Sequence, residues 1–253
     1  MGLILSEKNV NISPTIYMEE YYKLHQEGCK MEDLARAVLE LYENVKFDNS
    51  WENMEFNEYE SIKDNIVIRL VQKKRNQELL KEIPYIPMLD LAVVFYMILE
   101  VTEFGMATMR VSNDTIERWN VNVQQLYVTA LMNTQRRLPG EFMTLNDVIG
   151  EGEPYVSAGP NMYVLSNDRK SYGAAAILYP GCLKRIGAYL KDDYFIVPSS
   201  VHEVIIVPYE EISDSQYLNE MVECVNSNCV TEEEILEDHV YYYRRSKDRI
   251  EIC

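Results

Sequence analysis

Apolar residues recur at helical spacing in several stretches of the chain. The clearest is 31–46, where apolar side chains return every three or four positions, as in a helix with one buried face: Met31, Leu34, Ala35, Val38, Leu41, Tyr42 and Val45. Ser13 followed by Pro14 is typical of a helix start and predicts a helix that runs to about His25. Similar patterns predict helices over 73–83, 113–119, 122–133, 183–190, 213–225 and 231–238.

Runs of β-branched and aromatic residues predict strands between these helices. They cover 66–71, 106–111, 162–165, 194–197 and 204–207, and 240–244 with 249–252 form an expected hairpin. Residues 91–99 are nine apolar residues without a polar break. Such a run fits a strand buried on both faces, but it also fits a buried helix, and periodicity does not separate the two.

The order of these elements predicts an α+β fold with mixed or antiparallel sheets and flanking helices. Residues 139–160 contain four of the ten glycines and three of the nine prolines, which is typical of a connection. We therefore expect two packed lobes, 1–138 and 161–253, joined by 139–160.

Charge and composition narrow the class of partner. The net charge is −17, with −8 over residues 1–60 and −9 over 201–253, while 61–200 is balanced. Sequence-independent binding to a duplex needs a basic footprint, so no nucleic-acid partner is expected. No apolar run approaches the about 20 residues that span a membrane, so no membrane partner is expected either. Five cysteines at irregular spacing, with no export signal, predict reduced thiols and a cytoplasmic location.

The segment 194–208 is the predicted functional edge. Two apolar stretches flank the polar residues 198–203, and loops held by rigid strands commonly carry binding groups. The predicted binding residues are Ser199, Ser200, His202 and Glu203. His202 with Ser200 or Cys182 also has the residue types of a base and a nucleophile, so these three are weak catalytic candidates. The alternative is a plain turn whose hydroxyl groups cap the backbone.

Common catalytic and metal motifs are incomplete. His202-Glu203 would need a second histidine at position 206 to form a zinc-protease motif, and that residue is Ile206. Cys224, Cys229 and His239 offer three of the four ligands that a structural zinc site requires. No phosphate-binding loop is present. The sequence therefore predicts no metal and no cofactor.

Three long stretches resemble a known family. They are SPTIYMEEYYKLHQEG at 13–28, IVIRLVQKKRNQELLKEIPYIPMLDLAVVFYMI at 66–98, and the segment 162–208, which contains YGAAAILYPGCLKRIG and YFIVPSSVHEVIIVP. They resemble an uncharacterised bacterial domain-of-unknown-function family of anaerobic Gram-positive bacteria (Firmicutes), whose members are often found near mobile genetic elements. The resemblance implies a bacterial cytosolic setting and one shared architecture, and it assigns no catalytic residue.

The function predicted from the sequence is that of a cytosolic, non-enzymatic protein that binds another protein. The alternative is a hydrolase that uses His202 with a nearby Ser, Cys or carboxylate.

Overall fold

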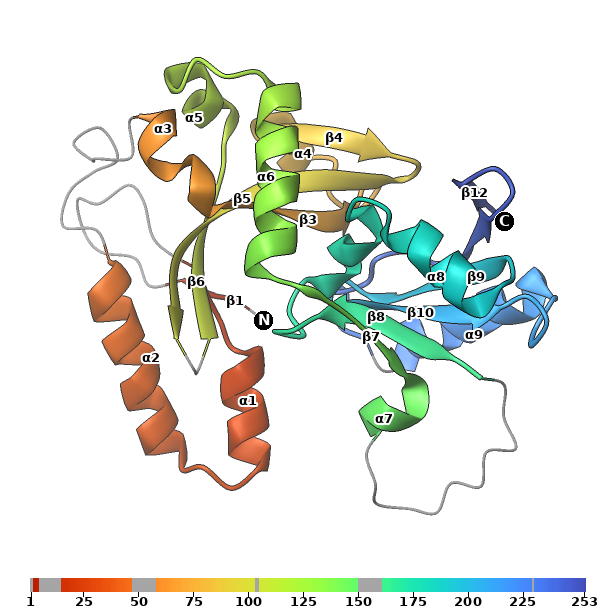
Figure 1. Ribbon diagram of the computed structural model, residues 1–253. Helices are drawn as coiled ribbons and strands as arrows, with labels where there is room; N and C mark the ends of the chain where they lie inside the picture. The colour runs from red at the N-terminus through yellow and green to blue at the C-terminus, as the bar shows by residue number, and fades with distance from the viewer. Residues whose placement is uncertain (1, 5–14, 47–57, 103–104, 150–160, 229) are drawn as a thin grey trace. The chain divides into compact units, whose positions relative to one another are not determined.

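The computed structural model describes residues 2–4, 15–46, 58–102, 105–149, 161–228 and 230–253. It contains helices and two open sheets whose described strand pairs are antiparallel (Figure 1). The predicted α+β class is therefore confirmed. No described helix has both the length and the apolar character that crossing a membrane requires.

The first sheet has six strands. Its order is β1 (Gly2–Ile4), β2 (Thr15–Tyr17), β6 (Gly105–Arg110), β5 (Leu91–Thr102) and β3 (Ile66–Gln72), and β4 (Tyr85–Met88) also pairs with β5. The apolar run at 91–99 is thus a strand, as its first interpretation predicted. A register shift between Ile98 and Glu100 marks a bulge opposite β6.

The second sheet also has six strands. Its order is β12 (Arg249–Ile252), β11 (Tyr241–Arg244), β9 (Tyr194–Ser200), β10 (Glu203–Pro208), β8 (Tyr163–Asn167) and β7 (Gly140–Thr144). Strands β12 and β7 are its edges. The predicted C-terminal hairpin is confirmed as β11 and β12, whereas the sequence patterns did not predict β4 or β7.

Contacts divide the chain into two units that are discontinuous in sequence. The first contains 1–67, 82–84 and 95–133, and the second contains 68–81, 85–94 and 134–253. The lobes expected at 1–138 and 161–253 stay a prediction, and residues 150–160 of the expected connection lie outside the described residues.

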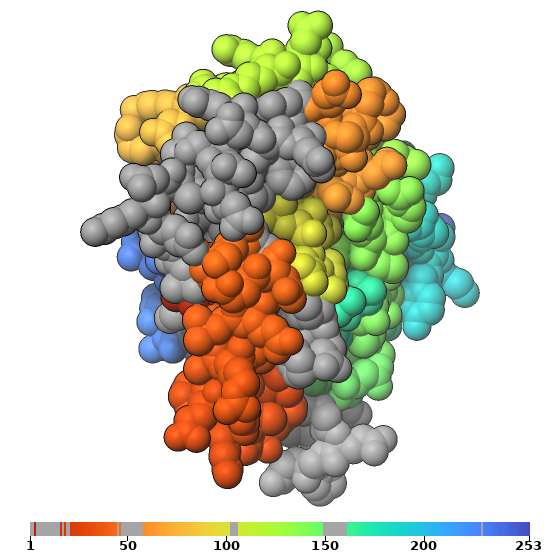
Figure 2. Space-filling view, turned by 90° about the vertical axis from the view of Figure 1, so that its left-hand side faces the viewer, coloured from red at the N-terminus to blue at the C-terminus, as the bar shows by residue number. Residues whose placement is uncertain are grey.

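In the first unit, α1 (Glu19–Gln26) and α2 (Met31–Val45) lie side by side (Figure 1). The helical spacing in α2 buries one face against β2 and β6, in a cluster of Ile16, Tyr21, Leu34, Val38, Leu41, Tyr42 and Ala107. The two helices form part of the surface in Figure 2. The other helices with residues in this unit are α3 (Tyr59–Ile62), the 3-10 helix η3 (Lys63–Asn65), α5 (Asn113–Arg118) and α6 (Val123–Arg137).

The second unit places helices on both faces of its sheet. Helix α9 (Ser215–Asn228) packs with Phe195 and Val197 of β9 in one apolar cluster. Helix α8 (Cys182–Leu190) approaches Tyr194, the neighbour of Phe195, through Gly187. Because successive side chains of a strand point to opposite faces, α8 and α9 cover opposite faces. The 3-10 helix η4 (Gly173–Leu178) precedes α8, and the short helices α4 (Leu79–Glu82) and α7 (Leu145–Ile149) complete the unit.

Two predicted helix starts are wrong. Residues Thr15–Tyr17 form β2, and α1 begins only at Glu19, because pairing with β6 holds the chain extended before the helix. Of the helix expected at 73–83, only Leu79–Glu82 is helical, since the backbone N–H of Lys73 donates to the carbonyl of Asp90 at 3.1 Å and so continues the sheet.

The acidic helix expected at 231–238 is also wrong. Thr231 and Glu234 close a single turn, and residues 235–240, which lead to β11, are irregular with a bend at Asp238 and His239. The carbonyl of Glu234 accepts a hydrogen bond from the N–H of Val201 at 2.9 Å instead of from its own next turn. Tertiary hydrogen bonding here overrides a favourable local helix signal.

Candidate functional site

The predicted loop at 198–203 is a tight strand connection. Strand β9 continues through Ser200 and β10 begins at Glu203, so only Val201 and His202 lie between the two strands. Ser199, Ser200 and Glu203 are therefore strand residues. The structure brings Ser200 to His202, because the N–H of His202 donates to Ser200 Oγ at 3.1 Å.

Several described neighbours surround the ring and backbone of His202. Its Nδ1 accepts a hydrogen bond from the backbone N–H of Tyr172 at 3.1 Å, and its Nε2 lies 3.6 Å from an oxygen of Glu234. Its carbonyl accepts from Ser166 Oγ at 2.8 Å. A ring nitrogen that already accepts a backbone N–H is not available to take a proton from a nucleophile. This geometry favours a structural role in which the ring holds the loop at Tyr172 against the β9–β10 connection. The predicted binding role stays a prediction.

The loop that reaches His202 is itself tightly packed. Tyr172 has a left-handed backbone, with φ of 53°. A Cβ atom at Gly173 would lie 2.6 Å from both the N atom of Asn167 and the carbonyl oxygen of His202, and nearer still to Ser166 Oγ. Only glycine fits at this position, so the close approach of 167–173 to the β9–β10 connection depends on Gly173.

Cys182 lies apart from this arrangement. It begins α8 and is buried, and burial raises the pKa of its thiol, which disfavours the thiolate that a nucleophile needs. The described contacts of His202 do not include Cys182. Cys29, Cys182, Cys224 and Cys253 are free thiols. Cys229 lies outside the described residues, so the Cys224–Cys229–His239 spacing stays untested.

A pocket opens between α8 and strands β7 and β8. Its volume is about 440 Å³, and apolar and aromatic side chains provide most of its lining: Gln135, Pro139, Gly140, Phe142, Leu165, Tyr179, Cys182, Arg185, Ile186 and Tyr189. The Phe142 ring stacks on Tyr163 at 4.9 Å, and Tyr189 meets both rings edge-on at 5.8 and 5.9 Å. Tyr189 is nevertheless 65% exposed. The volume and lining are those of a ligand site.

The pocket borders β7, an edge strand that has no second neighbour among the described strands. The carbonyl of Pro139 accepts from the N–H of Asp168, and the N–H of Leu145 donates to the carbonyl of Met162, each at 2.9 Å. Bonding toward β8 alternates along an antiparallel strand, so the intermediate residue Phe142 directs its N–H and C=O away from β8.

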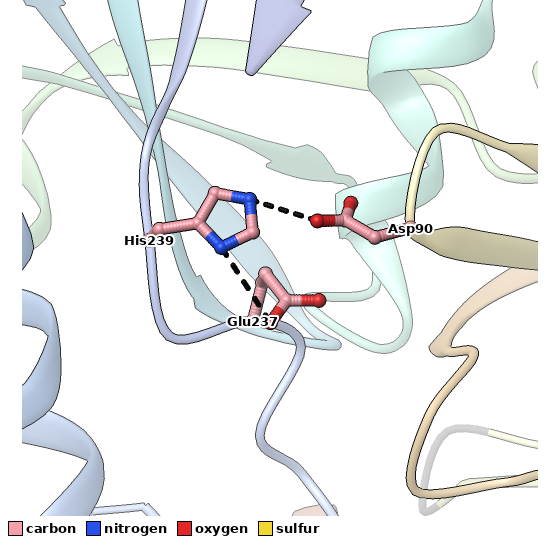
Figure 3. A group of neighbouring side chains, drawn as sticks. All are labelled: Asp90, Glu237 and His239. Atoms are coloured by element: carbon pink, nitrogen blue, oxygen red, sulfur yellow. Dashed lines mark ion pairs between the residues drawn. The ribbon is translucent and has the colours of Figure 1, made fainter. Parts of the chain in front are cut away.

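A second polar site gathers Asp90, Glu237 and His239 (Figure 3). Asp90 lies in the turn between β4 and β5, and the other two precede β11. Asp90 Oδ2 is 2.8 Å from Nε2 of His239, and Glu237 Oε1 is 3.7 Å from Nδ1. One imidazole ring thus lies between two carboxylates.

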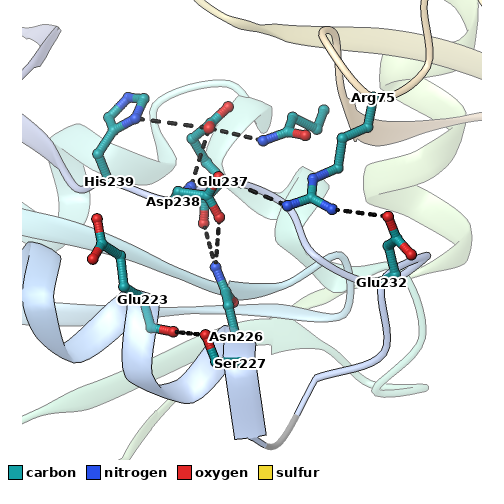
Figure 4. A network of polar contacts seen from close by, with 9 residues as sticks. Arg75, Glu223, Asn226, Ser227, Glu232, Glu237, Asp238 and His239 are labelled. Carbon is teal, nitrogen blue, oxygen red and sulfur yellow. Dashed lines mark hydrogen bonds and ion pairs between the residues drawn. The ribbon is translucent and has the colours of Figure 1, made fainter.

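Neighbouring side chains orient these carboxylates, and Figure 4 shows the polar contacts around Glu237. The hydroxyl of Tyr241 donates to Asp90 Oδ1 at 2.5 Å, and Gln72 Nε2 donates to Glu237 Oε1 at 2.8 Å. Burial, and then the hydrogen bond to Asp90, raise the pKa of Tyr241, so its phenol remains a donor at neutral pH. Glu237 is buried, with only 7% of its surface exposed.

Reasoning from the sequence missed this site. His239 was weighed only with Cys224 and Cys229, and Asp90 had no feature that linked it to a segment about 150 residues away. The only available signal was the closeness of Glu237 and His239 in sequence, and the bend at Asp238 and His239 that brings them to one site could not be predicted from it.

Comparison with known proteins places the chain by family. No curated protein and no solved structure matches it. A family profile matches residues 1–245, nearly the whole sequence. The chain belongs to the family described as a family of unknown function (DUF5688).

Proposed function

We propose that this protein is a non-enzymatic interaction protein that binds an extended segment of a partner protein along β7. A side chain of that segment, apolar or aromatic, enters the pocket beside Tyr189. The observation that carries the proposal is the position of an open, aromatic-lined pocket directly beside β7, whose outer edge pairs with no strand in the part of the chain that the structure describes.

Strand addition explains why the two features occur together. An extended segment that pairs with a sheet edge gains affinity from main-chain hydrogen bonds, and a pocket for its alternate side chains supplies specificity. Phe142 directs its backbone groups outward, and its ring lines the pocket. The same residue therefore meets both the backbone and a side chain of the segment.

Charge suggests which segment is favoured. Arg185 lines the pocket and uses Nη1 to donate to the carbonyl of Pro180 at 3.0 Å, which leaves other N–H groups of its five for a ligand. The chain as a whole carries −17, so a long acidic partner would be repelled. The segment that fits best has an apolar or aromatic residue beside a single acidic one.

The proposal includes the bacterial cytosol as the setting, as the family resemblance of the sequence implies. The predicted absence of nucleic-acid and membrane partners is part of it. The alternative, a hydrolase that uses His202, has less support, because Nδ1 of that ring already accepts the N–H of Tyr172.

Selection from a display library of random peptides tests the proposal. We expect the purified protein to enrich extended peptides with an aromatic or large apolar residue at one fixed position. Tyr189→Ala should abolish the enrichment. Tyr217→Ala, which removes a tyrosine that is 53% exposed on α9, is the matched control and should retain it.

Amide hydrogen exchange then locates the bound peptide. Strand addition should slow exchange of the Phe142 amide and leave the amides of α9 unchanged. Absence of any enriched motif, or enrichment that Tyr189→Ala and Tyr217→Ala reduce equally, would contradict the proposal.

A further inference from the structure

The arrangement around His239 is unusual for a simple hydrogen-bonded network. Asp90 Oδ2 is 2.8 Å from Nε2, yet this buried nitrogen has no aligned hydrogen bond among the described residues. An N–H to carboxylate contact of that length normally points along the N–H bond. The close but misaligned pair resembles two ligand atoms arranged around a common centre.

The charges of the site point the same way. Asp90 and Glu237 share one imidazole, and the nearby cationic side chain of Arg75 contacts Glu232 and Asp238 instead, at 3.4 and 3.8 Å. Gln72 is 3% exposed, and its Oε1 has no described donor although its Nε2 is bound to Glu237. A buried carboxylate beside a second, partly exposed one, together with a buried amide oxygen that has no described donor, favours a cation.

We propose that Asp90, Glu237 and His239 bind a divalent transition-metal cation, and that Zn²⁺ fits these ligands best. One imidazole nitrogen and two carboxylate oxygens form a ligand set that zinc accepts. Three protein ligands leave a further coordination position for water or another ligand, as in zinc sites that are not purely structural.

The distances agree with such a site. One ligand atom from each of the three residues lies within 4.8 Å of the others. Two ligands about 2.1 Å from a zinc ion at a tetrahedral angle are about 3.4 Å apart, so small side-chain rotations suffice. His239 and Asp90 have side-chain exposures of 25% and 29%, so both side chains are partly exposed, although His239 Nε2 itself is buried.

Neighbouring groups hold the proposed metal ligands in place by hydrogen bonds. Tyr241 fixes Asp90, while Gln72 Nε2 and the N–H of Asp238 both donate to Glu237 Oε1, at 2.8 and 3.0 Å. Groups that orient metal ligands in this way commonly change affinity by about 10- to 100-fold when they are removed.

Titration of chelator-stripped protein with Zn²⁺ tests the proposal. All five cysteines are first changed to serine, which removes binding to thiols. We expect one tight site in this protein, and a Co²⁺ absorption band that Zn²⁺ displaces. Affinity should fall by more than about 100-fold in His239→Gln and in Asp90→Asn, and by about 10-fold in Tyr241→Phe.

His25→Gln is the matched control, since this histidine lies in an exposed part of α1 and should leave the affinity unchanged. Circular dichroism without metal establishes that each variant is folded, and Tyr241→Phe provides a mild variant if His239→Gln is not. No tight site, or equal losses in His239→Gln and His25→Gln, would overturn the proposal.

Discussion

His202 and His239 lie in the same unit and each faces a glutamate, but their surroundings differ in kind. At His202 one ring nitrogen accepts a backbone N–H, and the peptide groups on either side of the ring are fixed by serine hydroxyls. At His239 both ring nitrogens face carboxylates. The His202 ring holds two loops together, whereas the His239 ring lies between two carboxylates.

The difference separates two uses of a partly buried histidine. A ring bound to the backbone contributes to stability and has little freedom to change partner. A ring between carboxylates can exchange its proton for a cation without any change in the main chain. The polar segment predicted to be functional thus contains the histidine whose ring is bound to the backbone, and its binding role stays a prediction.

Gly173→Ala should lower the free energy of unfolding more than any other change near His202. The added Cβ meets the backbone of Asn167 and His202 at 2.6 Å, so the loop must move away from the β9–β10 connection. Overpacking of this kind costs about 3 kcal/mol. Denaturant unfolding should show the loss, with the matched change Gly140→Ala, whose Cβ meets nothing nearer than 3.4 Å, losing much less. Equal losses would mean that the close approach is unimportant.

His202→Ala should lower the free energy of unfolding by about 2 kcal/mol, because the N–H of Tyr172 loses its acceptor in a partly buried place. Thermal or denaturant unfolding measures the loss. A variant that keeps wild-type stability but no longer binds peptide would reverse the comparison and restore His202 as a functional residue.

The stability of the protein at alkaline pH should test the surroundings of His239 through its neighbour Tyr241. Burial, followed by the hydrogen bond to Asp90, raises the pKa of Tyr241, so the neutral phenol is favoured in the folded state. Its contribution is complete below the unfolded pKa of about 10 and falls by about 1.4 kcal/mol for each pH unit above it. Unfolding between pH 9 and 11 should therefore show a shallower decline in Tyr241→Phe. An unchanged decline would place Tyr241 outside the cooperative core.

Tyr189→Ala should have the smallest effect on stability, within about 0.5 kcal/mol, because the ring is mostly exposed. The same melting experiment measures it. A loss of several kcal/mol would show that the aromatic group is structural, and it would remove the basis for a binding pocket beside β7.

The sequence predicted elements whose pattern repeats locally. The spacing in α2 and α6 and the β11–β12 hairpin carry their own signal, whereas the uninterrupted apolar run of β5 fitted both a strand and a buried helix. The segment 231–238 had an equally good helix signal, yet Val201 captures the carbonyl of Glu234 and the helix does not form. Such competition depends on the β9–β10 connection, which lies earlier in the chain.

The same limit applies to the sites. The residues around His202 were found because they are neighbours in sequence, as Ser200 and Glu203 are. Asp90 and Tyr241 are 151 residues apart, and only the fold brings them together. The pocket was missed for a similar reason, because its wall combines a strand edge, a helix and the end of α6.

The bonds from Gln72 to Glu237 and from Asp90 to Tyr241 join residues 165 and 151 positions apart. During synthesis β3 and the β4–β5 turn emerge long before their partners, and translation adds only about 5–20 residues each second. Gln72 and Asp90 therefore remain without these hydrogen-bond partners for many seconds during synthesis. Completion of this unit is consequently a late event in biosynthesis, and a ribosome stalled before residue 241 would hold a chain that chaperones and proteases can still recognise.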